Sequence, residues 1–101
     1  MKDNQDYLDL LRKIKNDPQA SQRKLAIDLN FSLGKLNYCL KALKAKGLIK
    51  IMNFEKNPKK LNYIYLLTPK GISEKTKLTL NFMKKKIKEY DELKAELKKN
   101  K

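Results

Sequence analysis

The residues best suited to chemistry lie on one arc of a predicted helix that follows Ser32 and ends near Lys46. Apolar residues recur at every third or fourth position of this helix, which assigns its other side to a core. That buried stripe comprises Leu36, Cys39, Leu40 and Leu43. The remaining arc contains no acidic residue and comprises Gly34, Lys35, Asn37, Tyr38 and Lys41. An ordinary solvated face would mix glutamate, lysine and glutamine, so this arc requires another explanation.

The side chains of this arc match the chemistry of the DNA major groove. Asparagine can bond adenine through two hydrogen bonds, lysine can reach guanine or phosphate, and a tyrosine ring can contact the thymine methyl group. Gly34 leaves room for a close approach of the helix backbone. We therefore predict that the arc reads base pairs, the alternative being a merely exposed helix with Tyr38 half-buried.

Two other segments are predicted to contact phosphates. Ser21, Gln22 and Arg23 begin a preceding helix, whose backbone N–H groups can hold a phosphate while Ser21 also caps the helix. Ser32, at the start of the following helix, belongs to the same predicted DNA-binding set. A loop between two predicted strands adds residues that would lie along the minor groove or its phosphates, the alternative being a solvated turn. These are Lys56, Asn57, Lys59 and Lys60.

The net charge supports a polyanionic partner. The chain of 101 residues has 25 Lys and Arg against 11 Asp and Glu, a net charge of +14. The excess is uneven, because residues 1–31 are nearly balanced whereas residues 44–68 carry six basic side chains and one acidic. Nucleic acid or an anionic membrane is the usual reason for such a charge, and a lysine-rich proteome is the alternative.

Composition argues against catalysis and against a bound cofactor. The chain has no His and a single Cys, so neither a zinc site nor a Ser–His or Cys–His pair can form. Its three glycines do not make a phosphate-binding loop. Cys39 lies on the core side of its helix, where packing is favoured over redox sensing. With neither a signal peptide nor an apolar run that could span a bilayer, we expect a cytoplasmic protein without a membrane partner.

The local signals predict a mainly α protein with a small β-hairpin. A first helix spans residues 3–16, with Asp6 and Asp9 near the positive end of its dipole. A second follows Ser21 and ends at Asn30, which suits a left-handed turn, and the third stops at Gly47. Strands are predicted at 48–54 and 63–67, joined by a polar loop. A long last helix runs from Pro69, behind the capping Thr68, to about Lys98.

The spacing of apolar residues in the second and third helices is typical of a helix-turn-helix. The residues that fall where two such helices pack are Leu25, Leu29, Phe31, Leu36 and Cys39. Ala26 falls where only a small side chain permits a close crossing, and Asn30 falls at the turn. We predict a winged helix-turn-helix DNA-binding domain over residues 1–68 and a dimerisation helix over residues 69–101.

This order of elements resembles the winged helix-turn-helix of MarR-type transcription regulators, closest to a compact subgroup associated with exopolysaccharide genes. The resemblance rests on "SLGKLNYCLKALKAKGLIKI", "NFEKN", "YIYLLTPKGI" and "EKTKLTLNFMKKKIKEYDELKAE". "LTPKG" matches the common family motif LTxxG, and "NYCLKAL" is the narrower mark of the subgroup. The wing has lysines where many relatives have arginine. The resemblance implies DNA binding, repression and exopolysaccharide genes as targets, and it leaves a small-molecule effector undefined.

The long last helix is predicted to form a homodimer. Its apolar residues recur along its whole length, and only the first helix of the same chain is left to cover them. A second copy of this helix, packed about a two-fold axis, would supply the missing cover. The alternative is a single helix that frays after about Tyr90. The residues assigned to the dimer interface are Tyr7, Leu11, Ile72, Leu80, Met83, Ile87, Tyr90 and Leu97.

Together these patterns predict a sequence-specific regulator that binds double-stranded DNA as a dimer and has no enzymatic activity. Two alternatives remain open at this point. One is a non-specific architectural protein that binds DNA or RNA through its charge. The other is a protein-interaction module whose basic surface fits an acidic partner.

Overall fold

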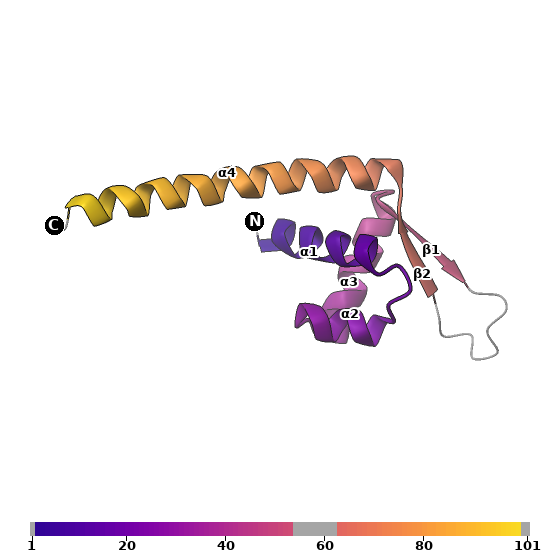
Figure 1. Cartoon of the computed structure of the whole chain (residues 1–101). Coiled ribbons are helices and arrows are strands. Elements are labelled where there is room, and N and C mark those ends of the chain that lie inside the picture. The colour runs from indigo at the N-terminus through magenta and orange to yellow at the C-terminus, as the bar shows by residue number, and fades with distance from the viewer. Residues whose placement is uncertain (1, 54–62, 100–101) are drawn as a thin grey trace.

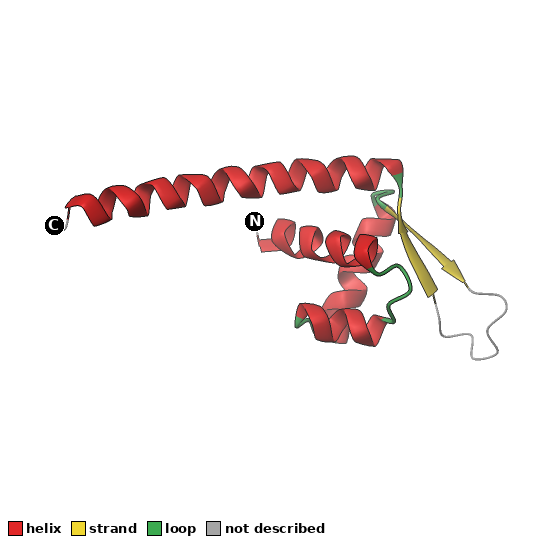
Figure 2. Ribbon diagram, in the orientation of Figure 1, coloured by secondary structure: helices red, strands yellow, loops and turns green. Residues whose placement is uncertain are grey.

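The computed structural model describes residues 2–53 and 63–99. Four helices and one hairpin follow in the order α1 (Lys2–Asn16), α2 (Gln22–Leu29), α3 (Leu33–Ala45), β1 (Ile49–Asn53), β2 (Tyr63–Leu67) and α4 (Pro69–Lys99), as Figures 1 and 2 show. The two strands pair antiparallel with Ile51 opposite Tyr65. This architecture confirms the predicted winged helix-turn-helix with a long C-terminal helix. The predicted wing contacts Lys56, Asn57, Lys59 and Lys60 lie outside the described residues.

The predicted caps and turns set the directions of α2 and α3. The hydroxyl of Ser21 accepts a hydrogen bond from the Lys24 amide at 3.1 Å, and that of Ser32 accepts one from the Lys35 amide at 3.1 Å. Asn30 adopts the left-handed conformation with φ 57°. Such a residue ends a helix by redirecting its backbone, so the short turn before α3 is fixed by local chemistry.

A second set of local contacts joins the hairpin to α4. The Thr68 hydroxyl donates to the Gly47 carbonyl at 2.6 Å and accepts from the Gly71 amide at 3.0 Å. Gly47 itself has φ 73°, a left-handed conformation that suits glycine. A Cβ atom on Gly71 would collide with the backbone carbonyl of Leu48. The LTPKG motif therefore serves a close junction between the end of α3, the hairpin and α4.

The core lies where α1, α2 and α3 meet the hairpin. Its largest fully buried side chains are Leu10, Leu11, Ile14, Leu25, Leu36, Leu43 and Tyr65. Leu78 of α4 packs against this cluster, and α4 contacts α1. The core thus holds the helix-turn-helix rigidly against the first part of α4.

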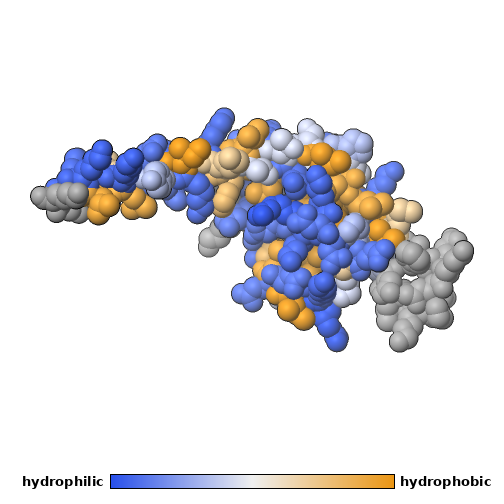
Figure 3. Space-filling model, in the orientation of Figure 1, coloured by the Kyte–Doolittle hydropathy of each residue, from blue (hydrophilic) through white to orange (hydrophobic). Residues whose placement is uncertain are grey.

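The second half of α4 extends past the rest of the chain (Figure 1). The molecule measures 65 × 26 × 20 Å along its principal axes, and Figure 3 shows apolar residues interspersed with polar ones along this extension. Large apolar side chains of α4 are more than two-fifths exposed: Ile72, Leu80, Met83, Ile87, Tyr90, Leu93 and Leu97. These residues form the exposed apolar stripe of α4. No helix in the described ranges is long and apolar enough to cross a membrane.

The assignment of Tyr7 and Leu11 to a dimer interface was wrong. Their side chains are 8% and 0% exposed and lie in the core of the single chain. The helical spacing of α1 correctly indicated one buried face. However, α2, α3 and the hairpin cover this face together with α4, so it is not available to a second copy.

Candidate nucleic-acid interface

The predicted reading helix α3 is held by its buried stripe. Leu36 and Leu43 are fully buried, and Leu40 and Cys39 are nearly so. Phe31 and Leu29 pack at the edge of the same cluster. Cys39 therefore occupies a core position, as the sequence predicted. With this side of α3 fixed against α1 and α2, the opposite arc faces outward.

The outward arc of α3 carries the predicted readers. Gly34, Asn37, Tyr38 and Lys41 are all exposed, and the Tyr38 side chain is 64% exposed rather than half-buried. A Cβ atom on Gly34 would meet no atom within 4 Å, so the space above the first turn is open. The structure thus brings these four positions together on the exposed side of α3, a helix that contains no acidic residue. Their contact with bases stays a prediction.

Lys35 differs from the other members of the arc because α1 holds its side chain. Its Nζ atom lies 3.0 Å from a carboxylate oxygen of Asp6 and 4.4 Å from the centre of the Phe31 ring. The ion pair is partly exposed, with the Lys35 side chain at 46% and that of Asp6 at 23%. The cation is therefore directed toward α1 instead of standing free. Sequence reasoning assigned Asp6 to the helix dipole and did not detect this partner.

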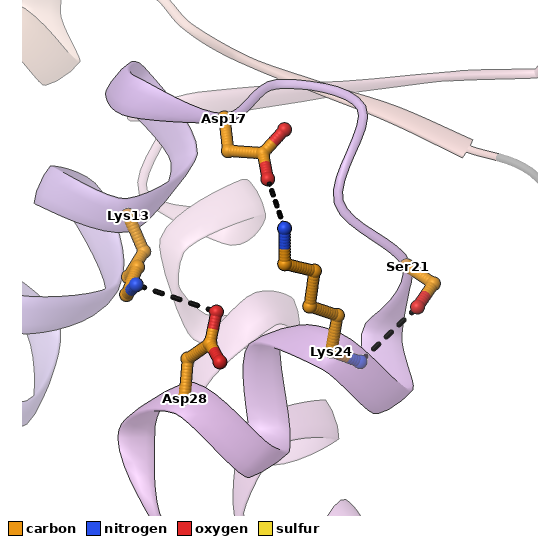
Figure 4. Close-up of polar contacts among 5 residues, drawn as sticks. All are labelled: Lys13, Asp17, Ser21, Lys24 and Asp28. Carbon is orange, nitrogen blue, oxygen red and sulfur yellow. Dashed lines mark hydrogen bonds and ion pairs between the residues drawn. The ribbon is translucent and has the colours of Figure 1, made fainter.

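Two ion pairs connect α2 to α1 and to the turn between them, as Figure 4 shows. Lys24 lies 2.9 Å from Asp17, and Lys13 lies 3.3 Å from Asp28. The Asp17 carboxylate raises the pKa of the Lys24 ammonium through a hydrogen bond and direct attraction. These exposed pairs each contribute little to stability. They do, however, give two cations, Lys13 and Lys24, a carboxylate partner within the chain.

The three residues predicted at the start of α2 have different environments. Ser21 is exposed and caps the helix, and Arg23 is exposed beside it. Gln22 is half-buried and interacts with the hydroxyl of the buried Tyr65. Burial raises the pKa of Tyr65, and Gln22 opposes this rise only in part. No described residue gives the Tyr65 hydroxyl a hydrogen bond of ordinary geometry. Of the three, Ser21 and Arg23 are the better placed to reach a phosphate.

Comparison with known proteins places this surface in a recognised class of domain. Residues 8–50 match the family described as winged helix-turn-helix DNA-binding. This range contains α1, the whole helix-turn-helix and the start of the hairpin. No curated protein matches the sequence. The matched range ends before α4, so the match concerns the helix-turn-helix part of the chain.

Solved structures of MarR regulators share the fold over most of this chain. MarR from Staphylococcus aureus, in complex with salicylate and kanamycin, matches with a TM-score of 0.68 and 21% identity, covering 85% of this chain and 56% of that one. A mutant of MepR from S. aureus matches with a TM-score of 0.67 and 21% identity, covering 98% of this chain and 76% of that one. A mutant of MarR from Escherichia coli, complexed with operator DNA, matches with a TM-score of 0.61 and 21% identity. The match covers 71% of this chain and 50% of that one.

These likenesses define the fold as that of MarR-family regulators. The chain spans about half of the length of the two MarR proteins. In the described residues, no group of three or more His, Cys, Asp or Glu side chains could hold a metal ion. The chain has the fold of a winged helix-turn-helix followed by one long helix.

Proposed function

We propose that the chain is a cytoplasmic, homodimeric transcription regulator of MarR type that binds double-stranded DNA sequence-specifically and represses its targets. Residues 1–68 bind DNA and residues 69–101 form the dimer, without a cofactor or enzymatic activity. The observation that carries the proposal is the exposed, acid-free arc of α3, held on a rigid helix-turn-helix. The resemblance to the exopolysaccharide-associated subgroup supports genes of that kind as targets.

Four members of the arc have defined roles in this proposal. Asn37 pairs with adenine, Tyr38 contacts a thymine methyl group, and Lys41 adds affinity through guanine or phosphate. Gly34 permits close approach of the helix. Ser21, Gln22, Arg23 and Ser32 contact phosphates from the helix starts, and the four wing residues do so from the hairpin loop. A structure of a MarR mutant with operator DNA supports the DNA-binding role, since its fold is similar to that of this chain.

The exposed apolar stripe of α4 supports the homodimer. Leu80, Met83, Ile87, Tyr90 and Leu97 are separated by three, four or seven residues, the spacing of a seam between two packed helices. Each of these side chains is at least half exposed in the single chain. A second α4 related by a two-fold axis would bury this seam in both copies. It would also present two α3 helices to neighbouring major-groove half-sites.

Selection of bound sites from random duplex DNA by the full-length chain tests this function. We expect a near-palindromic site with half-sites about 10 base pairs apart. Binding to this site should persist at about 0.15 M salt in the presence of excess random DNA. These conditions suppress non-specific electrostatic binding. Light scattering at micromolar concentration should give twice the chain mass of 11.9 kDa.

Other results would contradict the proposal in distinct ways. Equal affinity for all duplexes, or preference for RNA, would indicate an architectural nucleic-acid-binding protein. Recovery of a discrete acidic protein, with no nucleic acid, would indicate an interaction module. A mass near that of one chain would leave DNA binding intact and remove the dimer.

A further inference from the structure

Leu33, the first residue of α3, is an exception among the leucines of the helix-turn-helix. Between Leu8 and Leu48, the leucines are buried or half-buried, except that Leu33 is 52% exposed. The capping of α3 does not explain a leucine here, because Ser32 supplies the cap. A single exposed leucine is ordinary on a protein surface. A binding role for Leu33 must therefore be argued from the residues around it.

The neighbours of Leu33 are the predicted base readers. Residues four apart lie on one side of a helix, so Leu33 lies one turn before Asn37 along the same edge of the arc. Gly34 follows it and leaves the space above the first turn open. The nearest cation in sequence, Lys35, has its Nζ atom paired with Asp6 of α1 at 3.0 Å. The exposed end of α3 therefore presents an apolar side chain, not a charge.

The major groove offers one apolar group, the C5-methyl of thymine. In helix-turn-helix proteins, the N-terminal residues of the reading helix contact base edges. We infer that Leu33 contacts a thymine methyl group in each half-site and thereby specifies thymine at one position next to the base pair read by Asn37. This inference rests on the proposed function and adds a specificity-determining residue to it.

Replacing single thymines by deoxyuridine tests this contact, because the change removes the methyl group and keeps base pairing. The full-length chain is titrated with its selected site and with copies that carry deoxyuridine at one thymine position in both half-sites. Burial of one methyl group predicts a loss of roughly fourfold per half-site at a single position. In the Leu33→Ala variant, the thymine and deoxyuridine sites should bind with equal affinity at that position.

Two further variants make the result specific to Leu33. Ile27 of α2 is 70% exposed, whereas its neighbours Leu25 and Ala26 are buried. Ile27→Ala removes a similar apolar surface and should leave the deoxyuridine effect unchanged. Leu33→Met keeps an apolar side chain of similar size and should retain most of the discrimination. Circular dichroism of each variant checks that the helices are intact.

The possible outcomes separate this inference from the proposed function. If a site is selected but no thymine shows methyl dependence, or if Leu33→Ala keeps the full deoxyuridine effect, Leu33 does not read thymine and the regulator remains. If the full-length chain selects no sequence, the proposed function fails and the role of Leu33 fails with it.

Discussion

Helices α3 and α4 are built alike but present opposite surfaces. In α3 and in the first part of α4, one side packs on the core and the other is exposed. The exposed side of α3 carries an amide, a phenol and lysines without a carboxylate, whereas that of α4 carries a run of large apolar side chains. The same secondary structure can thus serve two partners, because the chemistry of the exposed side decides what can bind there.

The two surfaces also differ in how binding energy arises. Apolar burial is non-directional and grows with area, so the exposed stripe of α4 can supply a large and permanent association. Hydrogen bonds to bases depend on direction, and each contributes only about 1–3 kcal/mol of discrimination. The comparison predicts that changes in α4 affect assembly strongly, while changes in α3 affect sequence preference more gently.

The largest expected effect comes from the stripe. Changing both Ile87 and Tyr90 to Gln removes four apolar side chains from the dimer interface, two from each copy. Burial of such side chains is worth ~1.5–3 kcal/mol each, so the dimer should weaken by about 4 kcal/mol or more. Sedimentation at several concentrations measures this directly. Lys88→Gln, on the opposite side of α4, is the control and should leave the mass unchanged.

Two glycines near the helix starts sharpen the comparison. A Cβ atom added to Gly71 of α4 would collide with the Leu48 carbonyl of the same chain. A Cβ atom added to Gly34 of α3 would have no neighbouring atom within 4 Å. Gly71→Ala must displace backbone, so urea unfolding should show a loss of about 3 kcal/mol. Gly34→Ala should stabilise the helix by up to about 1 kcal/mol while weakening DNA binding. Unchanged DNA affinity in Gly34→Ala would show that DNA does not approach this position closely.

Base reading by α3 gives the next effect in size. Asn37→Ala should cost about 2 kcal/mol on the selected site and relax preference at one base position, because the bidentate pair with adenine is lost. Lys41→Gln is the comparison, since loss of a phosphate contact should weaken all sequences alike. Titrations of both variants with selected and random duplexes measure the difference. Equal losses on both duplexes for Asn37→Ala would contradict base reading by this residue.

The sequence predicted the features that depend on neighbouring residues. The caps at Ser21, Ser32 and Thr68 and the left-handed Asn30 all follow from local chemistry, and the structure confirms them. The apolar spacing also identified the buried side of α3. Such patterns depend on residues only a few positions apart, so a single amino-acid sequence is enough to detect them.

Contacts between distant segments could not be predicted in the same way. Periodicity showed that Tyr7 and Leu11 face a partner surface, but not whether that surface belongs to the same chain. The approach of Asp6 to Lys35 depends on how α1 crosses the start of α3, and the interaction of Gln22 with Tyr65 depends on the position of the hairpin. No residue spacing encodes these crossings directly.

The smallest expected effect concerns the ion pair between α1 and α3. Asp6 holds Lys35 at 3.0 Å, so the carboxylate competes with DNA for this cation. In Asp6→Asn the lysine can turn toward a phosphate. Affinity for all duplexes should then rise severalfold, and the slope of log K against log salt should steepen by about one unit per monomer. Fold stability should fall by no more than about 1 kcal/mol, as for other exposed pairs.

The controls for this pair separate a specific competition from a general change in charge. Asp9→Asn removes the same charge from α1 and should raise affinity less, without steepening the slope by a full unit. Adding Lys35→Gln to Asp6→Asn should abolish the gain, because no freed cation remains. A gain that persists in the double variant would mean that net charge, rather than Lys35, limits binding. Loss of the gain would show that α1 restrains the DNA-binding surface of α3 through a single carboxylate.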